Sequence, residues 1–182
     1  ESHFGEIVAG IFSEEVIGLK KVYNKLSLLT SENANAYKID LVFCDPKSDP
    51  LELVFGQVKS SPKSLSDGFP SNHDKSCYAD VFNAMNEYLD KDLSFDLTAA
   101  SDNLDVLEPP LRDRVRAALL PYSHTPVKYA AFVLIDRATK HDDEMSLLES
   151  RKNKKSFEVD VICVEEYRAV ADEVYRFLEK LK

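Results

Sequence analysis

The chain has 182 residues, of which 44% are hydrophobic and 30% are charged. This length suits a single domain, and the composition excludes a chain that is disordered throughout. The formal net charge of −9 argues against non-specific nucleic-acid binding by the surface as a whole, because neutralising phosphates requires Lys and Arg. The longest apolar runs, such as 129–135, are much shorter than the roughly 20 residues that span a bilayer.

Cysteine and glycine usage excludes two further kinds of site. Cys44, Cys77 and Cys163 are far apart and show no zinc-binding spacing, so we expect reduced thiols in a cytoplasmic protein. The glycines form no phosphate-binding loop, so we expect no nucleotide cofactor in this chain. We see no signal peptide and expect no membrane association. The chain begins at Glu1 instead of Met, which is compatible with its being the C-terminal part of a longer protein.

The first half of the chain predicts two helices with three strands between them. Apolar residues at helical spacing indicate a helix over 3–15 and another over 75–90. The apolar stripe of the first helix consists of Phe4, Ile7, Val8, Ile11 and Phe12. Segments rich in apolar and β-branched residues predict the strands, over 20–29, 37–44 and 51–59. The segment 45–50, which contains two prolines, is typical of a loop.

The second half predicts further helices and two strands. One or two helices are expected over 93–120, the second of them starting near Pro110. The nearly continuous apolar segment 127–135 predicts a strand that is buried on both faces. The charged segment 138–154 is compatible with a helix or a loop. A strand over 157–164 and an amphipathic helix over 165–181, with Val170, Val174, Phe177 and Leu181, complete an α/β fold with a mixed sheet flanked by helices.

The third predicted strand carries polar residues on one face near its end. Side chains alternate along a strand, so Leu53, Phe55, Gln57 and Lys59 share a face. Two apolar positions are therefore followed by an amide and an ammonium group on the same side. A face that turns polar at the end of a strand is a common place for a site.

The second predicted strand holds Asp40 among apolar residues. A buried carboxylate without a partner is unfavourable, so Asp40 requires a partner or a metal ion. If the strands 37–44 and 51–59 form a hairpin centred near Ser48 and Asp49, Asp40 lies close to Gln57. We therefore expect the hairpin to bring the two side chains together.

The first predicted helix supplies a third polar group. Glu6 and Gly10 lie beside its apolar stripe, where Gly10 allows a close approach to another backbone and Glu6 can lean towards Asp40. Carboxylate and amide oxygens suit Mg²⁺ or Mn²⁺ better than zinc. A lysine next to such a site can orient or deprotonate water and offset the charge that develops in a transition state.

Three short motifs resemble a known superfamily. The sequence GEI at 5–7, KID at 38–40 and GQVKSS at 56–61 resembles the PD-(D/E)xK nucleases. More narrowly, the chain resembles the C-terminal nuclease domain of the HamA family, the effector subunits of Hachiman anti-phage defence systems. The resemblance is best over 3–92. It implies that residues 1–182 form one nuclease domain with a restriction-endonuclease-like αβββαβ core.

The resemblance also implies an activity and the residues that carry it. The expected activity is hydrolysis of DNA by metal-activated water, with Mg²⁺ or Mn²⁺ as cofactor and a helicase-like protein as partner. Glu6 and Asp40 would bind the metal ion, Lys59 would be the catalytic lysine, and Gln57 would occupy the second acidic position. Two departures are Ile39 in place of the proline and Gln57 in place of the acid, which brings no negative charge to the metal.

Two other interpretations remain open at this point. The first is a nuclease-fold module that binds DNA or a partner protein without catalysis, which the amide at Gln57 favours. The second is an acidic protein-interaction domain, which the net charge of −9 and the closing helix 165–181 favour. The sequence leaves open whether the substrate is DNA or RNA and whether cleavage is internal or terminal.

Overall fold

The structure is a computed structural model that describes residues 2–24, 39–61, 77–88, 93–120, 124–140 and 157–180. Its α-helices are α1 (Ser2–Phe12), α2 (Cys77–Tyr88), α3 (Ser94–Asp102), α4 (Pro109–Ala118) and α6 (Tyr167–Lys180). Its strands are β1 (Lys20–Asn24), β2 (Leu41–Asp45), β3 (Glu52–Ser61), β4 (Val127–Asp136) and β5 (Glu158–Val164). Shorter turns are the π-helical η1 (Ser13–Ile17) and the 3₁₀ turns η6 (Leu104–Val106) and η7 (Arg137–Thr139).

The five strands form one open sheet in which spatial order follows chain order. Strands β1, β2 and β3 are antiparallel neighbours, whereas β3, β4 and β5 run parallel to one another. The sheet is therefore mixed, and the predicted α/β class is confirmed. In the part of the chain that the structure describes, no helix is long and apolar enough to cross a membrane.

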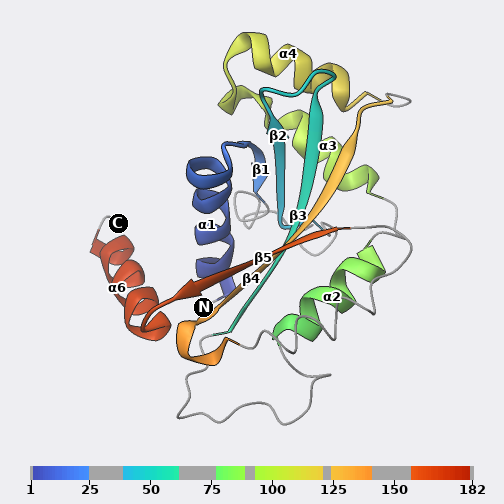
Figure 1. The fold of residues 1–182 in the computed structure, drawn as a ribbon. Helices are drawn as coiled ribbons and strands as arrows, with labels where there is room; N and C mark the ends of the chain where they lie inside the picture. The colour runs from blue at the N-terminus through green and yellow to red at the C-terminus, as the bar shows by residue number, and fades with distance from the viewer. Residues whose placement is uncertain are drawn as a thin grey trace.

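Helices cover both faces of this sheet (Figure 1). One face packs against α1 and α6, through an apolar cluster that includes Phe4, Phe43, Phe132 and Tyr167. The opposite face packs against α2, α3 and α4 through two other clusters. Strand β4 lies between the layers, and each of its residues from 130 to 135 is buried. The prediction that this strand is buried on both faces is confirmed.

The predicted alternation on β3 is also confirmed. Leu53 and Phe55 pack with the α3 and α4 layer, whereas Val54 and Val58 pack with α1. Of the one or two helices predicted over 93–120, the structure has two, α3 and α4, and α4 begins at Pro109, next to the predicted Pro110. A proline suits this first turn because its missing N–H has no helical acceptor there.

The start of the second strand differs from the prediction. Strand β2 begins at Leu41, and residues 37 and 38 lie outside the described part of the chain. Regular alternation over the predicted strand 37–44 would place Ile39 on the same face as Leu41, but Ile39 packs with Val42 and Cys44 instead. The chain bends at Asp40, and this bend interrupts the alternation.

Some predicted helix faces were wrong in detail. Ile11 is 55% exposed on α1, and on α6 Val170 and Phe177 are 38% and 60% exposed. Helix α6 buries Tyr167 and Ala171, and of the predicted stripe Val174 packs against the same apolar cluster. Most of the charged segment 138–154, from residue 141 onwards, lies outside the described residues, as does Leu181.

Candidate functional site

Asp40 and Gln57 lie against each other where β2 begins. Leu41 pairs with Gly56, so Asp40 is next to Gln57 across the hairpin. The backbone N–H of Asp40 donates to the carbonyl of Gly56 at 3.2 Å. Its Oδ2 accepts a hydrogen bond from the backbone N–H of Val58 at 2.8 Å. The carboxylate of Asp40 thus binds the peptide group that follows Gln57, and the hairpin brings the two residues together as predicted.

Gln57 brings an unsatisfied oxygen to this place. The residue is only 8% exposed, and within the described residues its buried Oε1 has no hydrogen-bond partner. A buried carbonyl oxygen in this condition typically lowers stability by about 1–3 kcal/mol. Such an atom requires an explanation, and a bound cation or an ordered water are the usual ones.

The segment that carries Asp40 is held from the opposite side by α3. Asp96 is 1% exposed, and its Oδ1 accepts a hydrogen bond from the backbone N–H of Ile39 at 2.8 Å. Asp40 is itself 7% exposed. Two buried carboxylates therefore satisfy backbone donors near the bend: Asp96 accepts from Ile39, and Asp40 accepts from Val58 on the neighbouring strand β3, beyond the last paired residues of β2.

Lys59 lies two residues beyond Gln57 on the same face of β3. In the parallel pairing with β4, Gln57 is opposite Ala131 and Lys59 is opposite Val133. Both partners pack against α2, so Gln57 and Lys59 lie on the α2 side of the sheet. Lys59 is partly exposed, whereas Gln57 on the same face is buried.

Glu6 approaches the same end of β3 from the opposite face. A Cβ atom on its neighbour Gly5 would lie 2.8 Å from Cβ and Oγ of Ser60, so α1 touches the strand here. The Glu6 side chain is 14% exposed, and its Oε1 is 4.0 Å from Nδ1 of His3. Three of the predicted residues are therefore neighbours at the start of β2 and along β3, whereas Glu6 lies in the α1 layer, next to the Gly5 that meets the same strand end.

The close contact involves Gly5 and not Gly10. A Cβ at Gly10 would meet nothing within 4 Å, so the predicted reason for that glycine was wrong. Gly5 and the buried Asp96 were the positioning residues that the sequence interpretation missed. Small residues at helical spacing, Gly5 and Ala9, are a signal that could have indicated the first, and an acid inside the short helix α3 could have indicated the second.

The donor set is poor in negative charge for a metal site. The described part of the chain contains no group of three or more His, Cys, Asp and Glu side chains that could hold a metal ion. Asp40, Gln57 and Glu6 would offer carboxylate and amide oxygens, which suit Mg²⁺ or Mn²⁺. The buried, unsatisfied Oε1 of Gln57 fits such an ion.

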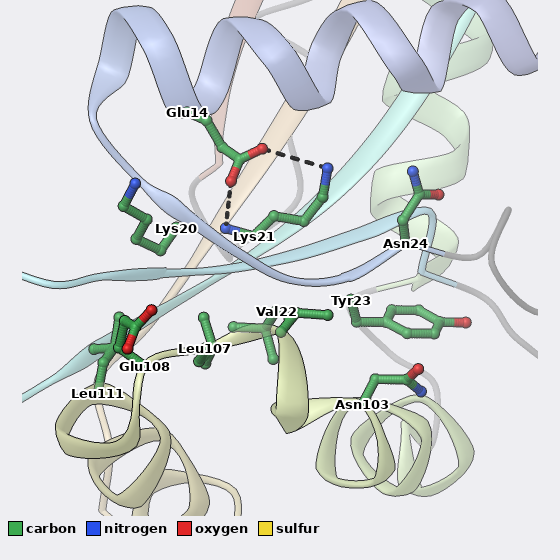
Figure 2. Close-up of a pocket in the computed structure, with 11 residues that line it drawn as sticks. Glu14, Lys20, Lys21, Val22, Tyr23, Asn24, Asn103, Leu107, Glu108 and Leu111 are labelled. Atoms are coloured by element: carbon green, nitrogen blue, oxygen red, sulfur yellow. Dashed lines mark hydrogen bonds and ion pairs between the residues drawn. The ribbon is translucent and has the colours of Figure 1, made fainter.

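Away from these four residues, a hollow with a cavity volume of about 430 Å³ lies between β1 and α4. Figure 2 shows three apolar residues that line it: Val22 on β1, and Leu107 and Leu111 before and within α4. Above them Glu14 accepts a hydrogen bond from the backbone N–H of Lys21 at 3.3 Å, and its other oxygen lies 3.3 Å from the Lys21 ammonium (Figure 2). None of the four predicted site residues lines this hollow.

A smaller hollow of about 200 Å³ is lined by several acids at the other end of the sheet. Burial, and secondarily the neighbouring charge of Glu158, raises the pKa of Asp160 above its ordinary value. On the same wall, Lys128 forms an ion pair with Glu52 at 2.8 Å. The hydrogen bond to Glu52 raises the pKa of Lys128 above its ordinary value.

Comparison with known proteins supports the resemblance of the motifs. No curated protein matches the chain. Among protein families, HamA matches over residues 1–178, which is nearly the whole chain. The match covers both the hairpin that carries Asp40 and Gln57 and the helix that carries Glu6. The chain therefore belongs to the HamA family, which makes it a protein of Hachiman anti-phage defence.

Proposed function

We propose that the chain is a Mg²⁺-dependent deoxyribonuclease domain whose site consists of Glu6, Asp40, Gln57 and Lys59. The observation that supports this most strongly is the buried pair Asp40 and Gln57, in which Oε1 of Gln57 has no hydrogen-bond partner among the described residues. An ion bound there would satisfy this oxygen and offset the charge of Asp40. The membership in HamA supports the role in defence against phages.

Three side chains would hold the metal ion in this proposal. Asp40 would contribute the carboxylate oxygen that does not bind Val58, Gln57 its amide oxygen, and Glu6 a carboxylate from the α1 layer. A bound Mg²⁺ would polarise the phosphodiester and activate a water molecule for attack. With Gln57 in place of an acid, the site carries one negative charge less, so we expect weak binding of the metal.

Lys59 would act on the substrate from the same face of β3. Lys59 is partly exposed and lies two residues beyond Gln57 on the same face of β3, so its ammonium group would be close to a phosphate that contacts the amide. There it would orient the attacking water and neutralise the charge that develops on the phosphate. A lysine serves this purpose as a compact charge on a flexible side chain.

DNA is the proposed substrate, and a helicase-like protein is the proposed partner in the defence complex. The net charge of −9 means that binding must depend on a few local cations such as Lys59 instead of on a broad basic surface. We therefore expect cleavage to be strongest at low salt and to depend on the partner for delivery of DNA.

A second candidate function is a nuclease fold that binds DNA or protein without cleaving DNA. The observation that favours it is the absence, within the described residues, of a group of three His, Cys, Asp or Glu side chains that could hold a metal. Replacing Gln57 with Glu distinguishes the two functions. If Gln57→Glu binds Mn²⁺ and the unmodified protein does not, the site is degenerate and the second candidate is correct.

The decisive experiment is cleavage of supercoiled plasmid at low salt, with Mg²⁺, with Mn²⁺ and with EDTA. The unmodified protein is compared with Lys59→Ala and with Lys47→Ala, a control that removes an exposed lysine from the turn at the other end of the hairpin. We expect metal-dependent nicking that Lys59→Ala loses and Lys47→Ala keeps. Equal activity of all three proteins would refute the assignment of Lys59.

A further inference from the structure

The first turn of α1 is held by a residue near the other end of the chain. The backbone N–H of Phe4 donates to the hydroxyl of Tyr175 on α6 at 3.0 Å. The first N–H groups of a helix have no acceptor within the helix itself, so an outside group must satisfy them. Tyr175, which is 171 residues away in sequence, does so for Phe4.

Helix α6 is itself anchored to the sheet and packs against Phe4. The backbone N–H of Tyr167 donates to Oδ2 of Asp136 at 3.0 Å, which ties the start of α6 to the end of β4. The ring of Tyr167 packs edge-to-face on Phe4, with ring centroids 5.2 Å apart. Phe4 and Tyr167 are both buried. Two independent contacts therefore join α6 to Phe4, one through the backbone and one through the rings.

On its other side the same turn rests on β3. The 2.8 Å that would separate a Cβ on Gly5 from Ser60 shows that helix and strand are in direct contact. The first turn of α1 is thus held between α6 and the strand end that carries Lys59. Glu6 is the next residue of the helix, so the direction of its side chain depends on both contacts.

We infer that Tyr175 is a positioning residue for Glu6 and thereby sets the metal affinity of the site. This inference rests on the proposed function, because it assumes that Glu6 binds the ion. Tyr175 touches neither the ion nor the substrate, and it acts through the backbone of Phe4. A carboxylate that is oriented in advance binds an ion more tightly than one that must be ordered upon binding.

The test compares Mn²⁺ binding, followed by the loss of the free-ion EPR signal, in four proteins and one control, all without DNA. They are the unmodified chain, Tyr175→Phe, Glu6→Gln and the double variant. Tyr129→Phe is the matched control, because its ring packs on Phe55 near the far end of β4. Urea unfolding of each variant verifies that the comparison is made between folded proteins.

We expect Tyr175→Phe to weaken Mn²⁺ binding by about tenfold, the lower end of the range for groups that orient metal ligands. Tyr129→Phe should bind as the unmodified protein does, and Tyr175→Phe should have no further effect in the Glu6→Gln background. Amide exchange at Phe4 should become faster in both proteins that carry Tyr175→Phe, and should be unchanged in Glu6→Gln and Tyr129→Phe.

Three outcomes would overturn the inference. Equal Mn²⁺ affinity of the unmodified protein and Tyr175→Phe would refute it and leave the proposed function intact, provided that Lys59→Ala still abolishes cleavage. An equal loss in the Glu6→Gln background would show that Tyr175 acts on the fold in general and not through Glu6. Absence of Mn²⁺ binding by the unmodified protein would refute the proposed metal site and, with it, the role of Tyr175.

Discussion

Replacing Asp40 with alanine or with asparagine separates its structural contribution from its proposed contact with a metal ion. The structural contribution is the hydrogen bond that Oδ2 accepts from the backbone N–H of Val58 at 2.8 Å. Asparagine keeps an oxygen acceptor at this position but removes the negative charge. Alanine removes both and leaves the Val58 N–H, in a residue only 7% exposed, without this acceptor.

The two variants should differ clearly in stability. A buried donor that loses its acceptor lowers the free energy of unfolding by about 1–3 kcal/mol, and the lost charge-assisted bond places Asp40→Ala at the upper end of that range. Asp40→Asn exchanges a charged acceptor for a neutral one, which costs about 1 kcal/mol. We therefore expect the asparagine variant to be more stable than the alanine variant by about 1–2 kcal/mol.

The assay is urea unfolding followed by circular dichroism at neutral pH without metal, together with Mn²⁺ binding. Asp40→Asn should stay folded and lose most of its Mn²⁺ binding, because an amide lacks the charge that attracts the cation. Equal stability of the two variants would show that the contact with Val58 contributes nothing. Undiminished Mn²⁺ binding by Asp40→Asn would refute Asp40 as a ligand.

Two glycines of α1 and one acid of β5 give further predictions. Gly5→Ala should lower the free energy of unfolding by about 1–3 kcal/mol, because the new Cβ would overlap Ser60. In urea unfolding of the double variant, Ser60→Gly should restore most of this loss. Gly10→Ala, whose Cβ meets nothing within 4 Å, should instead raise stability by up to about 1 kcal/mol; a change of the same sign at both glycines would contradict the packing of α1. The pKa of Asp160 is raised in the folded state, so the folded protein binds the proton of the Asp160 carboxyl more tightly than the unfolded chain does. The contribution of Asp160 to the free energy of unfolding is therefore fully present at low pH and is lost as the pH rises above the ordinary value of 3.8. Asp160→Asn should therefore gain stability over the unmodified protein as the pH rises above 3.8 in urea titrations, and a difference that does not change with pH would contradict this.

Much of the site follows from short-range patterns in the sequence. Alternation along β3 places Gln57 and Lys59 on one face, because the side-chain period of a strand is two. The turn around Ser48 determines the register of the hairpin and so brings Asp40 to Gln57. The unbroken apolar segment of β4 predicts a strand buried on both faces, as the structure shows. Each of these depends only on residues that are neighbours along the chain or across one tight hairpin.

Other features depended on how the layers pack. An apolar stripe on a helix is wide, and the sheet decides which part of it is buried, so Ile11 and Phe177 are exposed although their spacing predicts contact. The close contact of Gly5 with Ser60 requires two segments that lie far apart in sequence, and so does the hydrogen bond from Phe4 to Tyr175.

The hydrogen bonds around the bend at Asp40 also depend on how the layers pack. The sequence by itself determined that a carboxylate sits beside an amide at the start of a strand. The tertiary structure decided that this carboxylate binds the Val58 N–H, and that the Asp96 carboxylate holds Ile39 from α3. The physical reason is that a backbone donor without a ladder partner accepts whichever buried oxygen the packing brings to it, and no local pattern encodes that choice.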